Sequence, residues 1–408
     1  YIDVKGMLSS LHGSAGAITA LQNSVAHYYQ RASSADYLGV DPTRRSLTGT
    51  GGYVKVGRKG NAKWNFSETF TWSSPGFDLN DMGYMKETDY LMNETEIMYR
   101  QTDIWKIFRY NAFTLSQKNM WNYGGTPFSN NASLRWQSMT MNRYEWDVKE
   151  TFAWNWLDSR LLRGGPDVRF GSYFLTSAKF NTDKAKRMMF MLKYEGDHNF
   201  EGNRFNTISP SLTFRLGNHV YLSGQLDYAW NTDEMQYVAT TSPLSSSSLA
   251  PYYYVMGHMD QKTYGLTLKL QVNVTPDISI QFYGAPFTSI AKYDDFKLAA
   301  DTKSHTFENR FQRIDPDQLT YADGVYTIGE GAGQMPFRNP DFRFNEFRSN
   351  LVARWEYLPG STLYFVWEHR MSNRDNWYSS GWGSNLDRMW GLPATNTFMI
   401  KMNYWFNL

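Results

Sequence analysis

The chain has 408 residues, of which 17% are aromatic, yet its mean hydropathy of −0.56 is polar. It carries 41 basic and 39 acidic side chains, and so small a net charge argues against the positive field of a nucleic-acid-binding protein. No stretch approaches the ~18 consecutive apolar residues of a membrane helix, and the absence of cysteine excludes disulfides and thiolate-bound metals.

Alternation of apolar and polar side chains with a period of two dominates the chain and predicts about sixteen β-strands. Leu266, Leu268 and Leu270, for example, alternate with polar residues. The strands are expected at 1–12, 46–58, 63–73, 88–102, 106–121, 130–142, 144–158, 170–181, 187–199, 204–216, 220–235, 263–274, 278–293, 342–357, 361–372 and 397–408.

Short and long connections alternate along these strands. Gly, Pro, Asn and Asp occupy the short ones, where a tight hairpin needs them. Short turns on one rim and long loops on the other are typical of outer-membrane barrels, with the short side periplasmic. The sequence therefore predicts an all-β, transmembrane, antiparallel up-and-down β-barrel, with a short helix expected within 14–31. The long extracellular loops are expected at about 13–45, 74–87, 236–262, 294–341 and 373–396.

The apolar face of such strands meets a protein core in a sandwich and lipid in a barrel. The loop pattern favours the barrel, so Lys401 and Asn403 of the last strand are expected to face the lumen. Tryptophans near strand ends are expected to form interfacial girdles where they face outward. The expected lipid-facing residues of the last strand are Phe398, Ile400, Met402, Tyr404 and Phe406.

Two sets of side chains are candidates for contacts inside the barrel and at its outer mouth. Charges of both signs on neighbouring strands favour a structural ladder in the lumen over ion selectivity. Its members are Arg348, Arg354, Glu356, Glu368 and Arg370. Loop aromatics supply stacking surfaces for sugars or rigid contacts for proteins, or else pack on one another to plug the mouth. They are Tyr252, Tyr253, Tyr254, Trp377, Tyr378, Trp382 and Trp390.

Signals for catalysis are weak. The seven histidines are scattered and form no H-x-x-x-H or H-E-x-x-H pair, and no G-x-S-x-G elbow occurs. Asp315, Asp317 and Asp323 have spacings that suit calcium, but they do not fit the pattern of a calcium loop. We therefore expect no catalytic residue, no cofactor and no metal.

Several segments resemble a known family: 13–15, 22–31, 73–83, 163–166, 347–357, 359–364 and 396–401. The chain is similar to the uncharacterised Bacteroidota outer-membrane family that joins an N-terminal family-nine-like carbohydrate-binding domain to a C-terminal β-barrel. The resemblance implies that further strands precede Tyr1 and that the sugar-binding module precedes those strands. The full barrel of such a protein would have about 25 strands. We therefore expect that, in the intact protein, 2–10 and 398–407 are not hydrogen-bonded to each other.

Three functions are open at this point. The preferred one is a non-enzymatic barrel in the cell outer membrane that passes or helps assemble large, glycan-related material. The second is a structural or docking subunit of a larger complex, with a lumen plugged by its own loops. The third is an outer-membrane hydrolase. The expected partners are the lipid bilayer, lipopolysaccharide, other outer-membrane proteins and glycans, and no nucleic acid.

Overall fold

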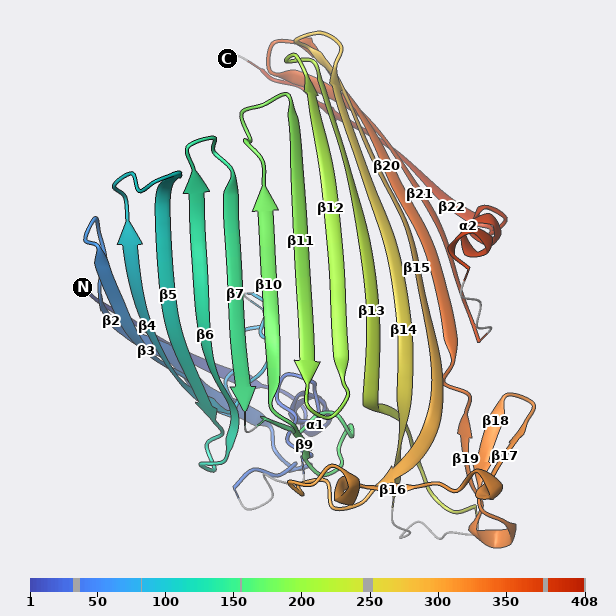
Figure 1. Cartoon of the computed structure of the whole chain (residues 1–408). Coiled ribbons are helices and arrows are strands. Elements are labelled where there is room, and N and C mark those ends of the chain that lie inside the picture. Colours follow the sequence, from blue (N-terminus) through green and yellow to red (C-terminus); the bar gives the residue numbers. More distant parts are fainter. Residues whose placement is uncertain (32–36, 82, 155, 245–251, 377–380, 407–408) are drawn as a thin grey trace.

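One large, curved β-sheet makes up most of the chain in the computed structural model, and the loops gather at one of its ends (Figure 1). The structure describes residues 1–31, 37–81, 83–154, 156–244, 252–376 and 381–406. Every pairing in the sheet is antiparallel, and each long strand pairs with its neighbours in the chain.

In the described residues the sheet has seventeen strands. They are β1 (Ile2–His12), β2 (Ser46–Arg58), β3 (Trp64–Ser73), β4 (Tyr90–Gln101), β5 (Phe108–Trp121), β6 (Pro127–Thr140), β7 (Glu145–Trp154), β10 (Tyr173–Asn181), β11 (Met188–Asn199), β12 (Arg204–Leu216), β13 (Val220–Thr241), β14 (Tyr253–Asn273), β15 (Ile278–Ala299), β16 (Phe311–Arg313), β20 (Phe342–Leu358), β21 (Ser361–Asp375) and β22 (Ala394–Asn403). Sixteen of them correspond one to one to the predicted strands, and the short β16 was not predicted.

Smaller elements lie between the long strands. The helix α1 (Ala15–Gln22) begins where the Ser14 hydroxyl accepts a hydrogen bond from the Ala17 N–H at 3.2 Å, and it is shorter than the predicted 14–31. The strands β8 (Trp156–Asp158) and β9 (Val168–Phe170) pair with each other. The others are β17 (Leu319–Ala322), β18 (Val325–Ile328), β19 (Met335–Arg338), α2 (Trp382–Trp390) and the 3-10 turns η2 (Glu308–Arg310), η3 (Pro316–Gln318) and η4 (Gly331–Gly333).

Three of the predicted loops are shorter than expected. The strand β13 continues to Thr241 and β14 starts at Tyr253, so most of the predicted loop 236–262 is strand. Likewise β15 continues to Ala299 and β21 to Asp375. Register shifts between Asp233 and Gln236 and between Tyr237 and Ala239 break the alternation in β13, which is why the pattern ended early there.

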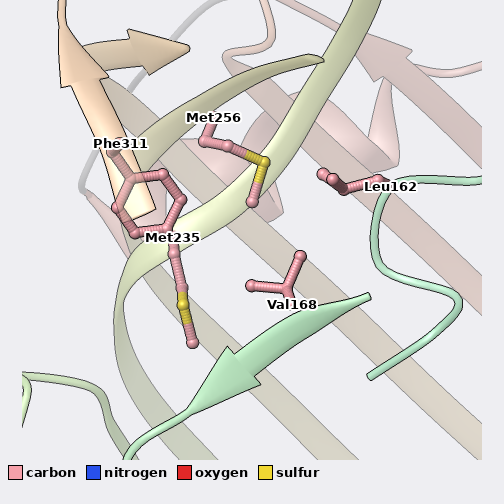
Figure 2. Packing of buried hydrophobic residues seen from close by; sticks show 5 residues of the cluster. All are labelled: Leu162, Val168, Met235, Met256 and Phe311. Carbon is pink, nitrogen blue, oxygen red and sulfur yellow. The ribbon is translucent and has the colours of Figure 1, made fainter. Parts of the chain in front are cut away.

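The buried core of the fold lies at the loop end of the sheet, where β13, β14 and β15 extend beyond their neighbours (Figure 1). Val255 and Met256 are successive residues of β14, so their side chains point to opposite faces, and both are fully buried. Met256 packs with Leu162, Val168, Met235 and Phe311 (Figure 2). Val255 packs with Phe296, Leu298, Ile328 and Phe337, which brings the small sheet β17–β19 onto the other face.

The sheet is not closed. Within the described residues β1 pairs with β2 alone and β22 pairs with β21 alone. The described residues therefore form an open antiparallel sheet and not the predicted closed barrel, and no pairing joins β1 to β22. That these two strands also stay apart in the intact protein remains a prediction.

Candidate functional site

The first feature that can carry function is the face of the sheet that holds the alternating apolar side chains. Directly opposed residues form a row from β11 to β22 without a polar member. The row is Met188, Phe214, Leu222, Leu270, Phe282, Leu351, Trp367 and Phe398. Leu222 is 41% exposed and Phe398 is 64% exposed. We call this the outer face, and it is apolar without being buried.

The last strand follows the same pattern. Ile400 lies opposite Phe365, and the Phe398 ring stacks on Trp367 with 6.1 Å between ring centroids. Phe398, Ile400 and Met402 are all more than 60% exposed. Because β22 ends at Asn403, Tyr404 and Phe406 lie after the strand, and their orientation does not follow from its register.

The opposite, inner face carries the predicted charge ladder, and the structure divides it into two groups. Arg348 and Arg370 lie directly opposite each other, and both bind Glu346 at 2.9 Å. Arg354 pairs with Glu356 on its own strand at 2.6 Å. Glu368 is exposed and takes part in none of the ion pairs in the described part of the chain.

Glu346 is the member that sequence reasoning missed. Two facing arginines repel each other unless a carboxylate bridges them, so the Arg348–Arg370 pairing itself implied an acid nearby. Glu346 lies two residues before Arg348 and therefore on the same face, which is the signal that could have identified it.

The predicted loop aromatics do not form one site. Tyr252 is 69% exposed, whereas Tyr254 packs against the Leu162–Val168 cluster of Figure 2. Trp390 ends α2 and makes an edge contact with Phe347, so α2 lies on the outer face of the sheet. Trp377 and Tyr378 fall outside the described residues, as does the side chain of Trp382.

The inner face at the loop end is covered by a cap of loops, which charged hydrogen bonds hold in place. The Asp89 carboxylate is 1% exposed and accepts hydrogen bonds from Arg31, from the Tyr37 hydroxyl at 2.6 Å and from the Tyr123 N–H at 3.0 Å. Burial and this bond to Asp89 raise the pKa of Tyr37. One carboxylate thus joins three loops that are far apart in the sequence.

A second anchor of the cap is Arg310, whose side chain is 1% exposed. Its guanidinium binds both oxygens of Glu201, at 2.9 and 2.8 Å, and donates to the carbonyls of Arg169, Ser304 and His305. Such a bidentate pair with further hydrogen bonds satisfies a buried charge. It fixes the segment after β15 to the turn between β11 and β12.

Two cavities open at the cap, on either side of Trp156 and Tyr173. Their volumes are about 510 and 420 Å³, and both are lined by Trp156, Asp158, Tyr173 and Leu175. The larger also has Arg31, Lys86, Lys118 and Arg160 in its wall. The smaller has Asp197, Asn199, Asn231 and Asp233 in its wall. Phe170, Phe205 and Met259 also line the smaller cavity, so its wall combines polar groups with an apolar surface.

One arrangement of a serine, a histidine and a carboxylate occurs in the described residues within the cap. The Ser24 hydroxyl lies 3.2 Å from His27 Nδ1, and His27 Nε2 lies 3.7 Å from Asp78. The latter distance is too long for a hydrogen bond, His27 is buried, and none of the three lines a cavity described above. Ser24 also accepts from the His27 N–H at 3.4 Å, so its hydroxyl serves the local turn.

Comparison with protein families assigns the chain through almost its whole length. Residues 13–408 match the family described as "Domain of unknown function (DUF5916)". The chain belongs to this family. No curated protein matches the chain.

In this DUF5916 domain, segments that carried the sequence resemblance meet in the cap. Thr88 donates to the Ala26 and Pro75 carbonyls, which ties the segments 22–31 and 73–83 together. A Cβ at Gly164 would lie 3.7 Å from Gln30, so the segment 163–166 packs there too. Among the residues that the structure describes, no helix has the length and apolarity to cross a membrane, and no group of three His, Cys, Asp or Glu could hold a metal.

Proposed function

We propose that the DUF5916 domain forms a large part of the wall of a β-barrel in the cell outer membrane. The observation that carries this proposal is the exposed apolar row of the outer face from β11 to β22, opposite a face with charged and amide side chains. In water, exposure of so continuous an apolar surface is unfavourable, at roughly 25 cal/mol per Å². In lipid, the same arrangement is the stable one.

The covered parts of the outer face agree with this proposal. The helix α2 lies over the outer face near the loop end, where Trp390 contacts Phe347. An apolar band with protein layers beyond it on one side is the arrangement expected of a barrel whose loops stand outside the membrane.

The open edges of β1 and β22 require partners in lipid, because each unpaired backbone group there costs several kcal/mol. We propose that further strands pair with both edges and complete a larger barrel. The inner face then lines a wide polar lumen, which suits a non-enzymatic role in passage or assembly of large, glycan-related material at the cell surface. Lipopolysaccharide and other outer-membrane proteins would be its neighbours.

A second candidate, a structural or docking subunit with a plugged lumen, is favoured by the cap that Asp89 and Arg310 hold over the inner face. Single-channel conductance of the intact protein in a planar bilayer separates the two. Steady conductance supports passage, whereas conductance that appears only after Arg310→Met loosens the cap supports the plugged barrel.

The membrane assignment is tested by a matched pair of substitutions on β14. Leu268 points to the outer face and Thr267, its neighbour, to the inner face. We expect Leu268→Arg to cost roughly 2–4 kcal/mol in lipid and to reduce the amount of assembled protein in the outer membrane, while Thr267→Arg leaves it nearly unchanged. Equal amounts of the two variants, or release of the wild-type protein by an alkaline wash, would contradict the proposal.

A further inference from the structure

The outer face differs between its two halves. From β11 to β22, two successive rows of opposed residues contain no Asp, Glu, Lys or Arg. The first is the apolar row already described, and the second is Phe190, Leu212, Gly224, Leu268, Gly284, Ser349, His369 and Asn396. In this half, the charged members of the outer face, such as Lys262 and Arg343, lie farther from the short turns. From β3 to β10, two carboxylates lie on the same face in the middle of their strands.

The first carboxylate is Glu68, in the middle of β3 between Phe66 and Phe70. It lies opposite Val56 on one side and Thr95 on the other. Glu68 accepts hydrogen bonds from the Asn93 amide and from the Thr95 hydroxyl, the latter at 2.6 Å. The row then continues from Thr95 to Gln117 on β5.

The second carboxylate is Glu150, in the middle of β7 between Val148 and Phe152. It lies opposite Leu134 and accepts a hydrogen bond from the Thr176 hydroxyl at 2.7 Å. With β4, β5 and β6 between β3 and β7, the two carboxylates are roughly 19 Å apart across the sheet. Both side chains remain exposed.

The two oxygens of each side-chain carboxyl group offer more acceptor positions than the one or two hydrogen bonds within the sheet use. Lipid tails offer no donor, and a polar group without a partner is costly there. The exposed positions are therefore complementary to donors that come from outside the sheet.

We propose that the β3–β10 half of the outer face binds a membrane-embedded segment of another protein, which presents amide, hydroxyl or cationic donors to Glu68 and Glu150. This inference rests on the proposed function, since it takes the outer face to lie in the membrane. A second copy of this chain is a different occupant, and the test below distinguishes it.

These 408 residues contain no cysteine, so a cysteine introduced here is the only thiol in this part of the protein. Leu115 and Leu134 lie in one row with Glu150, between the two carboxylates, and Leu115 is 54% exposed. Leu268, on β14 in the apolar half, is 40% exposed and serves as the matched control. Leu115→Cys and Leu268→Cys are each labelled with a benzophenone maleimide in outer membranes that contain the intact protein, and then irradiated.

We expect a discrete protein adduct from position 115 and lipid adducts alone from position 268. In the Glu68→Leu/Glu150→Leu background, the protein adduct at 115 falls about tenfold, as expected from the loss of two hydrogen bonds in a membrane. Lipid adducts at 268 in that background show that the altered protein is still assembled.

Lipid adducts alone at both positions overturn the inference, as does a protein adduct that persists without the two carboxylates. An adduct of two copies of this chain also overturns it. In each of these cases the lipid adducts at 268 keep the membrane assignment intact, whereas their absence contradicts the proposed function itself.

Discussion

At the scale of single residues, His27 shows how burial sets a protonation state. Its side chain is buried in the cap, and burial lowers its pKa, while the nearby Asp78 carboxylate raises it to a smaller extent. The imidazole is therefore neutral in the folded cap at neutral pH. Its contact with Asp78 at 3.7 Å is not an ion pair under those conditions.

This state makes the cap sensitive to acid. When the cap opens, His27 regains an ordinary pKa of about 6.5, so the open form binds a proton that the closed form excludes. The stability that neutral His27 contributes is present above pH ~6.5 and is lost as the pH falls from there toward the lowered pKa. We expect protease cleavage within 13–45 to accelerate through this range.

The measurement is the cleavage rate in the intact protein between about pH 7.5 and 5. The control is His27→Gln, which has no titrating ring and is measured at every pH. Its cleavage rate shows how the activity of the protease itself changes with pH. Identical pH profiles for the two proteins would contradict the prediction.

At the scale of elements, the segment between β15 and β16 depends on the buried Arg310–Glu201 pair. Arg310→Met leaves the Glu201 carboxylate, which is 13% exposed, without its cation. Breaking a buried pair in this way costs about 3–5 kcal/mol. We expect hydrogen exchange in residues 300–313 to accelerate strongly, while the sheet strands remain protected.

The matched control is Lys63, which pairs with Asp103 at 3.0 Å with side chains 59% and 72% exposed. An exposed pair of this kind contributes about 0–1 kcal/mol, so Lys63→Met should leave exchange nearly unchanged. Comparable effects of Arg310→Met and Lys63→Met would show that Arg310 does not anchor the cap.

At the scale of the whole molecule, the prediction concerns closure of the sheet. In the intact protein we expect the edges of β1 and β22 to pair with other strands and not with each other. Cysteines introduced in β1 at Ile2, Val4 or Leu8 should then form no disulfide with cysteines in β22 at Phe398, Ile400 or Met402. The pair Phe365 and Ile400, which lie directly opposite each other, is the positive control.

A disulfide between any of the β1 and β22 positions, formed as readily as the control, would show that the chain closes on itself as a sixteen-stranded barrel. If the sheet lies in a membrane, as we propose, the two edges cannot both remain unpaired, because unsatisfied backbone groups are too costly there.

The sequence alone determined where the strands lie and which side chains of each strand share a face of the sheet. Side-chain alternation is a local property of each strand, so it can be read without the tertiary structure. Leu268 and Ile400 were assigned to the apolar face from this pattern, and the register places them there. The predicted strands were too short at the loop end of β13 and β14. Other segments cover both faces there, and the alternation disappears.

Only the tertiary structure decided which distant residues meet. Glu201 and Arg310 are 109 residues apart, and Arg31 and Asp89 are 58 apart, so no local spacing could join them. The same holds for the two halves of the outer face. Only the register shows that Glu68 lies opposite Val56 and Thr95, and that Glu150 lies opposite Leu134 and Thr176. Local periodicity determines which way a side chain points, and strand pairing determines what it meets.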